Sequence, residues 1–308
     1  MPRHGQDPIY YASLLKASPE ELSARLAEGP EQAARIVYAA AVGGNSVAQV
    51  CYGQMLLDGH GVKPDAQAAM RWFAIAASAG DVDGINMLGR CYECGWGVAV
   101  DYSKALVCYR RAAARDHHWA QFNLATLMLR ADPTSGEVST ALTLLVRSAR
   151  QGNAKAMNMI GRYREFGWNC RADRASAMRW YRRAAVRGCF RGAAHLGRFL
   201  WTLGKADEAV CWYRRSIATA PLDFCRDLAA QLDAQDHSRL RTLAREALKR
   251  AAEGGEAADC FAYGCALVNE RGGPVNRAEA RVWLHRAEMA GIPGALAVLD
   301  ETAVGTQL

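Results

Sequence analysis

The sequence predicts an all-α fold, a right-handed α–α superhelix (solenoid) of about seven helix pairs with capping helices at both ends. Three observations lead to it: the composition, amphipathic segments at helical spacing, and an internal repeat. Of the 308 residues, 51% are hydrophobic, many of these are alanines, and only 9 residues are prolines. This composition favours helices throughout and argues against sheet or disorder.

The internal repeat is marked by a small or polar residue that ends a helix and returns every 36 positions from Gly44 to Gly188 (80 − 44 = 36), and again at similar intervals after one shorter unit. The marks are Gly44, Gly80, Asp116, Gly152, Gly188, Ala220, Gly255 and Gly291. We therefore expect capping helices in residues 1–44, a solenoid in 45–291, and a capping helix and tail in 292–308. Within the solenoid the repeats run over approximately 45–80, 81–116, 117–152, 153–188, 189–220, 221–255 and 256–291.

The second repeat shows how one unit is built. Ile85, Leu88 and Tyr92 fall on one face of its first helix. Gly89 on that helix allows a second helix to approach closely. The turn Gly95-Trp96-Gly97-Val98 has glycines that can adopt the positive φ needed to end a helix and reverse the chain. Asp101 then predicts the N-cap of the second helix.

The other repeats carry the same features at equivalent places. The Leu-Gly position recurs as Tyr52-Gly53, Ile160-Gly161, Leu196-Gly197 and Tyr263-Gly264. Further N-caps are expected at Asp65, Asp173 and Asn276, and large aromatics followed by alanines recur in the second helices as Trp72-Phe73, Trp180-Tyr181 and Trp212-Tyr213. The sixth unit, 221–255, keeps its alanines but lacks the Leu-Gly, glycine-turn and Trp-Tyr signatures.

Together these motifs resemble the Sel-one-like repeat family, a branch of the tetratricopeptide superfamily. The resemblance covers about Asn45 to Gly291. It implies a non-enzymatic scaffold or adaptor for protein–protein interaction, such as a bacterial regulator, a secretion accessory protein or an inhibitor.

The resemblance also implies that the first helix of each pair lines a concave groove that binds a partner. Positions between the packing residues of those helices then predict the contact residues Gln54, Asn86, Arg90, Trp119, Phe122, Asn158, Arg162, Arg191, Arg198 and Trp201. Arginines beside aromatic anchors indicate a protein or peptide partner with acidic plus hydrophobic character. The alternative is that Arg162 and Arg198 pair with local acids such as Glu165, while the aromatics pack between repeats.

The charge leaves a second class of partner open. The formal net charge is +7, and 32 of the 38 basic residues are arginines (38 − 6 lysines). An arginine-rich solenoid that binds nucleic acid is therefore the alternative function. The sequence disfavours it because acidic residues share the expected groove, whereas a phosphate-binding footprint should be a stripe of one sign.

No motif for catalysis, a cofactor or a metal stands out. Cys91 and Cys94 form a C-x-x-C, but no second pair at finger-like spacing accompanies them, and no strand precedes them as in redox motifs. Glycine-rich turns lack the strand and the Lys-Ser/Thr pair of phosphate loops. We expect no enzyme activity, and we interpret the 10 cysteines as small buried apolar residues.

The ends and the hydropathy indicate a compartment. The first residues are followed by no apolar stretch typical of a signal peptide, and no segment reaches the roughly 18 apolar residues of a membrane span. We therefore expect a cytoplasmic protein without membrane contact.

Overall fold

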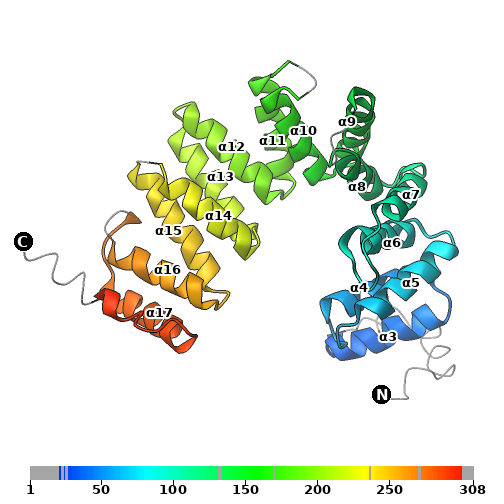
Figure 1. Ribbon diagram of the computed structural model, residues 1–308, viewed down its shortest axis with the longest axis horizontal. Coiled ribbons are helices and arrows are strands. Elements are labelled where there is room, and N and C mark those ends of the chain that lie inside the picture. Colours follow the sequence, from blue (N-terminus) through cyan, green and yellow to red (C-terminus); the bar gives the residue numbers. More distant parts are fainter. Residues whose placement is uncertain are drawn as a thin grey trace, which may run out of the picture. The chain divides into compact units, whose positions relative to one another are not determined.

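The computed structural model describes residues 21, 24, 27–130, 134–168, 171–235, 237–269 and 272–299, and within these ranges the regular elements are helices (Figure 1). They are α3 (Pro30–Val42), α4 (Ser46–Asp58), α5 (Ala66–Ser78), α6 (Val82–Cys94), α7 (Tyr102–Ala113), α8 (His118–Met128), α9 (Ser135–Arg150), α10 (Ala154–Phe166), α11 (Arg174–Val186), α12 (Phe190–Thr202), α13 (Ala206–Thr219), α14 (Leu222–Asp233), α15 (Ser238–Ala252), α16 (Ala257–Val268) and α17 (Arg277–Met289).

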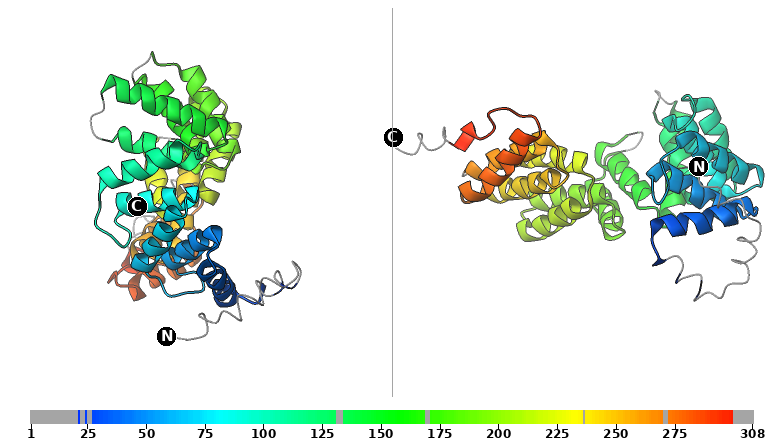
Figure 2. Two further views of the ribbon diagram at one scale, coloured as in Figure 1. Left: turned by 90° about the vertical axis from the view of Figure 1, so that its right-hand side faces the viewer. Right: turned by 90° about the horizontal axis from the view of Figure 1, so that it is seen from below.

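Successive helices pack as pairs, α4 with α5 and so on to α16 with α17, and within residues 1–153 and within residues 154–308 each pair also contacts the next along the chain. The part of the chain that the structure describes thus holds seven pairs preceded by α3, and within each of these two stretches consecutive pairs remain neighbours when the view is turned (Figure 2). The all-α solenoid predicted from the repeat is confirmed.

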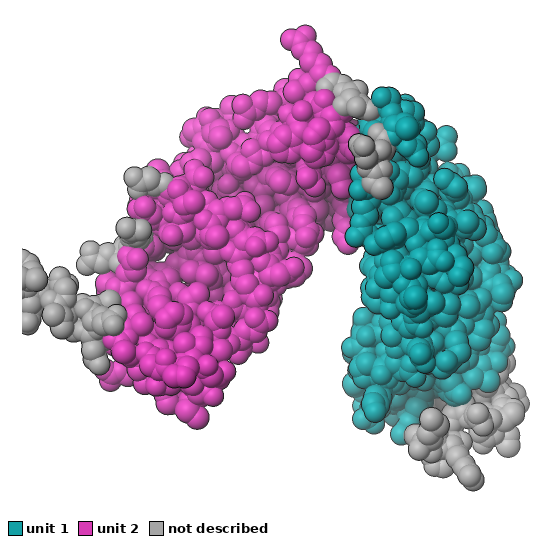
Figure 3. All heavy atoms as spheres, viewed as in Figure 1, with its two compact units in different colours: residues 1–153 teal, residues 154–308 magenta. Residues whose placement is uncertain are grey.

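The chain divides into two compact units (Figure 3). Unit 1 comprises residues 1–153 and contains α3 to α9. Unit 2 comprises residues 154–308 and contains α10 to α17. Each unit has its own buried clusters of alanine, leucine and aromatic side chains between the layers of helices.

The two helices of most pairs touch where a glycine of the first meets a ring of the second. A Cβ placed on Gly89 would stand 2.7 Å from the ring of Tyr109, and one on Gly161 would stand 2.6 Å from Tyr181. Both tyrosines are fully buried. Only glycine admits this approach, as the sequence predicted for Gly89. The same contact recurs at Gly53 with Phe73, Gly197 with Tyr213 and, with an aliphatic side chain, Gly264 with Leu284.

The turns and caps also follow the sequence prediction. Gly95 and Gly97 have φ of 75° and 69°. Gly97 additionally lies against the start of α5, where an added Cβ would be 2.7 Å from the Cα of Gln67. Asp101 accepts the backbone N–H of Lys104 at 2.9 Å. The other predicted N-caps, Asp65, Asp173 and Asn276, likewise accept N–H groups in the first turns of α5, α11 and α17.

The ends of the array are covered differently. α3 packs on α4 at the front. At the back, Ala295 and Leu299 are buried in one cluster with Tyr263 and Trp283 of the last pair. Most of the expected first capping helix and the tail after residue 299 lie outside the described residues.

We predict that Gly89→Ala destabilises the protein by about 1–3 kcal/mol, because the new methyl group must displace the buried Tyr109 ring. Urea unfolding followed by circular dichroism measures the change. The matched control is Gly136→Ala in the first turn of α9, where nothing lies within 4 Å of an added Cβ. It should leave stability unchanged or raise it by about 0.5–1 kcal/mol. Equal losses in both variants would contradict the packing role of Gly89.

Candidate partner-binding surfaces

In unit 1, the predicted contact residues on α4 and α6 are held by their own repeats. The Gln54 amide donates to both carboxylate oxygens of Asp58 at 3.0 and 2.9 Å. The guanidinium of Arg90 lies over the ring of Trp96, 4.8 Å from its centroid. Stacking fixes the plane of the guanidinium, and its Nη2 donates to the Cys94 sulfur at 4.0 Å, so the orientation of Arg90 is set before any partner binds.

The remaining predicted residues of unit 1 differ in exposure. The Asn86 side chain is 6% exposed, and its oxygen accepts the Asn123 amide of the next pair at 3.0 Å. Trp119 is 38% exposed and meets Phe122 edge to face, with ring centroids 6.3 Å apart. Asn86 thus joins two repeats below the surface, whereas Trp119 and Phe122 form a pair of aromatic rings that a partner could contact.

In unit 2, the stacked pair of unit 1 is repeated. Arg162 lies over Trp168 with 5.3 Å to the ring centroid, the same six-residue separation as Arg90 and Trp96 (168 − 162 = 6). Phe166 stacks on Trp168 at 5.2 Å, and the two rings are 55% and 40% exposed. This end of α10 presents apolar rings beside a cation. Asn158 of the same helix is only 7% exposed.

Arg198 is engaged in a network that links three helices. Its Nη2 donates to one oxygen of Glu165 at 2.5 Å, and the hydroxyl of Tyr181 donates to the other at 2.8 Å. Burial and the hydrogen bond to the Glu165 carboxylate raise the pKa of Tyr181. The pairing of Arg198 with a local acid corresponds to the alternative that the sequence left open, although the guanidinium side chain is still 43% exposed.

The other two predicted residues of unit 2 lie against aromatic rings. Arg191 is exposed and covers both Phe190 and Phe224, at 4.6 and 5.5 Å from the ring centroids. Trp201 is half-buried and meets His237 edge to face at 4.7 Å. Both side chains thus bridge from α12 toward the next helix pair.

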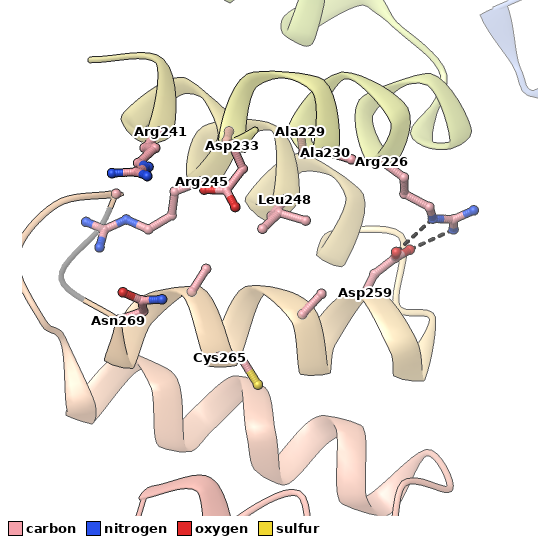
Figure 4. A pocket seen from close by; sticks show the side chains of 14 residues that line it. Arg226, Ala229, Ala230, Asp233, Arg241, Arg245, Leu248, Asp259, Cys265 and Asn269 are labelled. Atoms are coloured by element: carbon pink, nitrogen blue, oxygen red, sulfur yellow. Dashed lines mark hydrogen bonds and ion pairs between the residues drawn. The ribbon is translucent and has the colours of Figure 1, made fainter. Parts of the chain in front are cut away.

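A pocket that was not among the predicted sites lies between α14, α15 and α16 (Figure 4). Its volume is about 480 Å³. Alanines of α14 and α16 and Leu248 of α15 supply its apolar lining, while charged side chains lie at its two ends (Figure 4). The apolar lining consists of Ala229, Ala230, Ala244, Leu248, Ala262 and Ala266.

The pocket exists because three large side chains found elsewhere in unit 2 are replaced by smaller ones. When Gly197 of α12 is aligned with Gly264 of α16, His195 and Phe199 correspond to Ala262 and Ala266 (264 − 197 = 67). In α12 those two rings fill the space by packing on Tyr181, with centroids 4.7 and 5.7 Å away. The counterpart of Tyr181 is Leu248. Smaller side chains on both sides leave the space open.

Charge is distributed unevenly around the pocket. At one end Arg226 binds Asp259 through two hydrogen bonds of 2.7 and 2.6 Å and also pairs with Glu256 at 2.7 Å. Hydrogen bonds to Asp259 and Glu256 raise the pKa of Arg226, which stays protonated, and the two carboxylates balance its positive charge. Arg241 and Arg245 lie toward the other end, where Asp233 is beside Arg245, and Arg245 also donates to the Pro274 carbonyl at 3.0 Å (Figure 4). Two arginines and one aspartate leave that end with a net positive charge that can attract a carboxylate, while the middle accepts an apolar side chain.

Sequence reasoning missed this pocket for an identifiable reason. The groove positions of each repeat were assigned by their distance from its Leu-Gly motif. The sixth unit has no such motif, so no groove positions were assigned in it. One signal in the sequence could have indicated the pocket. On α16 the small residues Ala262 and Ala266 stand on either side of Gly264, so this face of the helix has no large side chain to fill the space next to it.

The cysteines and possible metal ligands call for one correction. Cys91, Cys189, Cys225 and Cys260 are buried as expected, but Cys51, Cys94 and Cys211 are exposed, so the buried interpretation is wrong for those three. Cys170 lies outside the described residues. In the described ranges, no group of three or more His, Cys, Asp and Glu side chains is arranged to hold a metal ion. None of the helices found there has the length and apolar content that a membrane span requires.

Four segments of the chain, residues 46–81, 82–117, 154–189 and 257–292, match the family model described as Sel1 repeat. The chain contains Sel1 repeats. These segments coincide with α4–α5, α6–α7, α10–α11 and α16–α17. The resemblance to Sel-one-like repeat proteins, and through them to the tetratricopeptide superfamily, is thereby confirmed.

Solved Sel1-type structures share the fold. A protective antigen of uropathogenic Escherichia coli that displays an SLR fold is 26% identical, with a TM-score of 0.54 over 97% of this chain and 67% of that one. A Sel1 repeat protein from Oxalobacter formigenes is 20% identical, with a TM-score of 0.55 over 92% of this chain and 100% of that one. The chitin synthase regulator SKT5 of Saccharomyces cerevisiae is 32% identical over 127 residues, which are 40% of this chain and 18% of the yeast protein.

We predict that His195 makes stability depend on pH. Desolvation, reinforced by Arg198 and by the weaker effects of Arg162 and Arg191, lowers the pKa of His195 to about 4 despite the opposing charge of Glu165. The unfolded chain takes up this proton near the ordinary pKa of 6.5, so stability is complete above that value and falls as the pH drops toward 4. Between about pH 7 and pH 5 the loss from this group is up to about 2 kcal/mol.

Urea unfolding of wild type and His195→Gln at both pH values measures this loss, because subtraction removes the contribution of all other groups. The variant should lose less stability than wild type on acidification. Parallel losses in the two proteins would show that His195 is not held neutral in the folded state.

Proposed function

We propose that this chain is a non-enzymatic scaffold whose solenoid, residues 45–291, binds a segment of a partner protein. Sel1-repeat proteins are generally interaction scaffolds of this kind. The observation that supports the proposal best is the pocket between α14 and α16, which combines an apolar middle with a cationic end. It fits the acidic-plus-hydrophobic partner that the sequence predicts.

The chemistry of the pocket defines the segment. An aliphatic or aromatic side chain would lie over Leu248, Ala262 and Ala266, where it replaces the rings that α12 carries at the equivalent places. An Asp or Glu nearby in the partner would pair with Arg241 and Arg245. The pocket is largely preformed by helices, so little binding energy is spent on ordering the scaffold.

The predicted contact residues extend this proposal to the first helices of the other pairs. Arg90 and Arg162 are stacked on turn tryptophans, which fixes the planes of their guanidinium groups, and Phe166 and Trp168 add exposed aromatic area. Aromatic and arginine side chains of this kind dominate interface energies. Because its guanidinium is shared with Glu165, Arg198 would contribute less than Arg162.

The role in the cell is proposed from the relatives. The yeast protein is named as a regulator of an enzyme, and the part of it that resembles this chain is a small share of its length. A cytoplasmic adaptor that regulates, inhibits or assists the secretion of a bacterial partner is consistent with an array of Sel1 repeats.

We predict that a phage-displayed library of random dodecapeptides selected on the wild-type protein enriches sequences with an acidic residue close to a large apolar one. Ala266→Phe should weaken the selected peptides at least 10-fold, because the ring fills the pocket as Phe199 fills the equivalent space. Ala258→Phe is the matched control, since Ala258 is exposed on the same helix and does not line the pocket. Fluorescence anisotropy of labelled peptides measures the affinities.

The other surface is tested with Arg90→Glu, Arg162→Glu and Arg198→Glu combined, after helicity has been checked. If this triple variant loses the peptides while Ala266→Phe keeps them, the binding site is on the first helices and not in the pocket. Selected peptides with no acidic or apolar preference, or equal weakening by Ala266→Phe and Ala258→Phe, would reject the proposed partner chemistry.

A further inference from the structure

The outward side of α11 has an unusual concentration of one charge. Arg179, Arg182, Arg183 and Arg187 follow at i, i+3, i+4 and i+8, so they share one face. All four are exposed. Together with Val186 they line a shallow pocket of about 280 Å³ that contains no other residue.

These arginines lack the acidic partners that neighbouring second helices have. On α13, Arg214 binds Glu246 of α15 at 2.8 Å, and Asp207 binds Arg239 of α15 at 2.6 Å. After its N-cap, α11 itself carries no Asp or Glu. Among the described residues, none of the four arginine side chains makes an ion pair or a hydrogen bond, although like charges at i, i+4 destabilise a helix.

One member of the set is held in a fixed orientation. The guanidinium of Arg183 lies over the Trp180 ring, 4.9 Å from its centroid. This stacking fixes the plane of the exposed guanidinium, which therefore has less rotational freedom to lose on binding. From Arg179 to Arg187 the helix rises about 12 Å, which matches three to four phosphate steps along one strand of a duplex.

We propose that this arginine face of α11 binds the phosphate backbone of a nucleic acid without regard to sequence. This is a second binding activity, separate from the pocket between α14 and α16. Guanidinium groups pair with phosphate oxygens through two parallel hydrogen bonds. A protein partner fits less well, because a stable protein interface needs an apolar core and Val186 is the only apolar side chain of the pocket.

The stripe of one sign is the feature that the sequence analysis required of a nucleic-acid footprint. It lies on a second helix, away from the first-helix positions where acids and arginines alternate. The disfavoured alternative is therefore revived at another surface. It does not compete with the proposed protein-binding function.

The test uses the full chain with two labelled probes, a duplex DNA and a single-stranded RNA of mixed sequence, followed by anisotropy at several salt concentrations. About four phosphate contacts predict a slope of log affinity against log salt of about −3 to −4, and about 100-fold weaker binding when salt rises about fourfold. The probe that binds more tightly identifies the preferred nucleic acid. Failure of both probes to bind overturns the proposal.

The variant Arg179→Gln, Arg182→Gln, Arg183→Gln, Arg187→Gln should bind at least 10-fold more weakly with a flatter salt slope. The control Arg71→Gln, Arg110→Gln, Arg147→Gln, Arg281→Gln removes the same charge, from +7 to +3 (7 − 4), at scattered exposed sites and should bind within about twofold of wild type. Equal losses in the two variants would mean that net charge alone attracts the probes, and would overturn the assignment to α11.

Two further measurements keep the result interpretable. Thermal melting checks that the quadruple variant is folded; if it is not, the double variant Arg179→Gln, Arg187→Gln should show a slope about half that of wild type, and a full slope would overturn the proposal. Competition with polyglutamate separates the classes of partner. If polyglutamate displaces the probes as well as unlabelled nucleic acid does, the surface recognises acidic protein instead.

Discussion

The contact between a glycine of each first helix and a ring of the second sets the separation of the two helices in most pairs. At Gly89 and Gly161 the tyrosine ring occupies the volume that any other residue would need. The same ring then extends toward the next pair, as Tyr181 does toward His195 and Phe199. The contact between the glycine and the ring therefore fixes both the packing within a repeat and the packing between repeats. The turns and N-caps only have to bring the two helices into this contact.

The surface features of the array depend on the same contact. The hydroxyls of Tyr109 and Tyr181 donate to the carboxylates of Glu93 and Glu165, and in unit 2 Glu165 also accepts a hydrogen bond from Arg198. Where Leu248 replaces the ring and alanines face it, a pocket remains. Some arginines outside these junctions are stacked on tryptophans, as Arg162 and Arg183 are, or paired across repeats, as Arg214 is, whereas the side chains of Arg179, Arg182 and Arg187 make no ion pair in the described part of the chain. The many arginines thus fall into groups with different surroundings, and these groups differ in how well they can bind a ligand.

The fold could be predicted because it depends on periodic positions: Gly89, Asp101 and the turn glycines each have a backbone or packing reason that recurs in several units. Burial at single positions could not be predicted in this way. Asn86 occupies a predicted groove position, yet it is buried and hydrogen-bonded to Asn123. Such positions lie at the border between the packed and the exposed face of a helix, and sequence spacing alone does not decide on which side of that border they fall. The pocket was missed for the opposite reason, since it results from departures from the repeat, Leu248 and Ala266, and not from its consensus. Likewise, the lack of acidic partners around Arg182 depends on residues distant in sequence.

Junctions between pairs that are filled by a tyrosine ring and the junction that leaves a pocket have different consequences when the array changes in length. Solenoids grow and shrink by duplication and deletion of whole repeats, and the fold tolerates this because each repeat contacts only its neighbours. In this chain, a deletion that joined α11 directly to α16 would bring the Tyr181 ring opposite Ala262 and Ala266, where it could fill the open space and keep the array intact. Such a shortened descendant would remain folded and lose its pocket. The order of the repeats, and not their number, would then carry the inherited ligand preference.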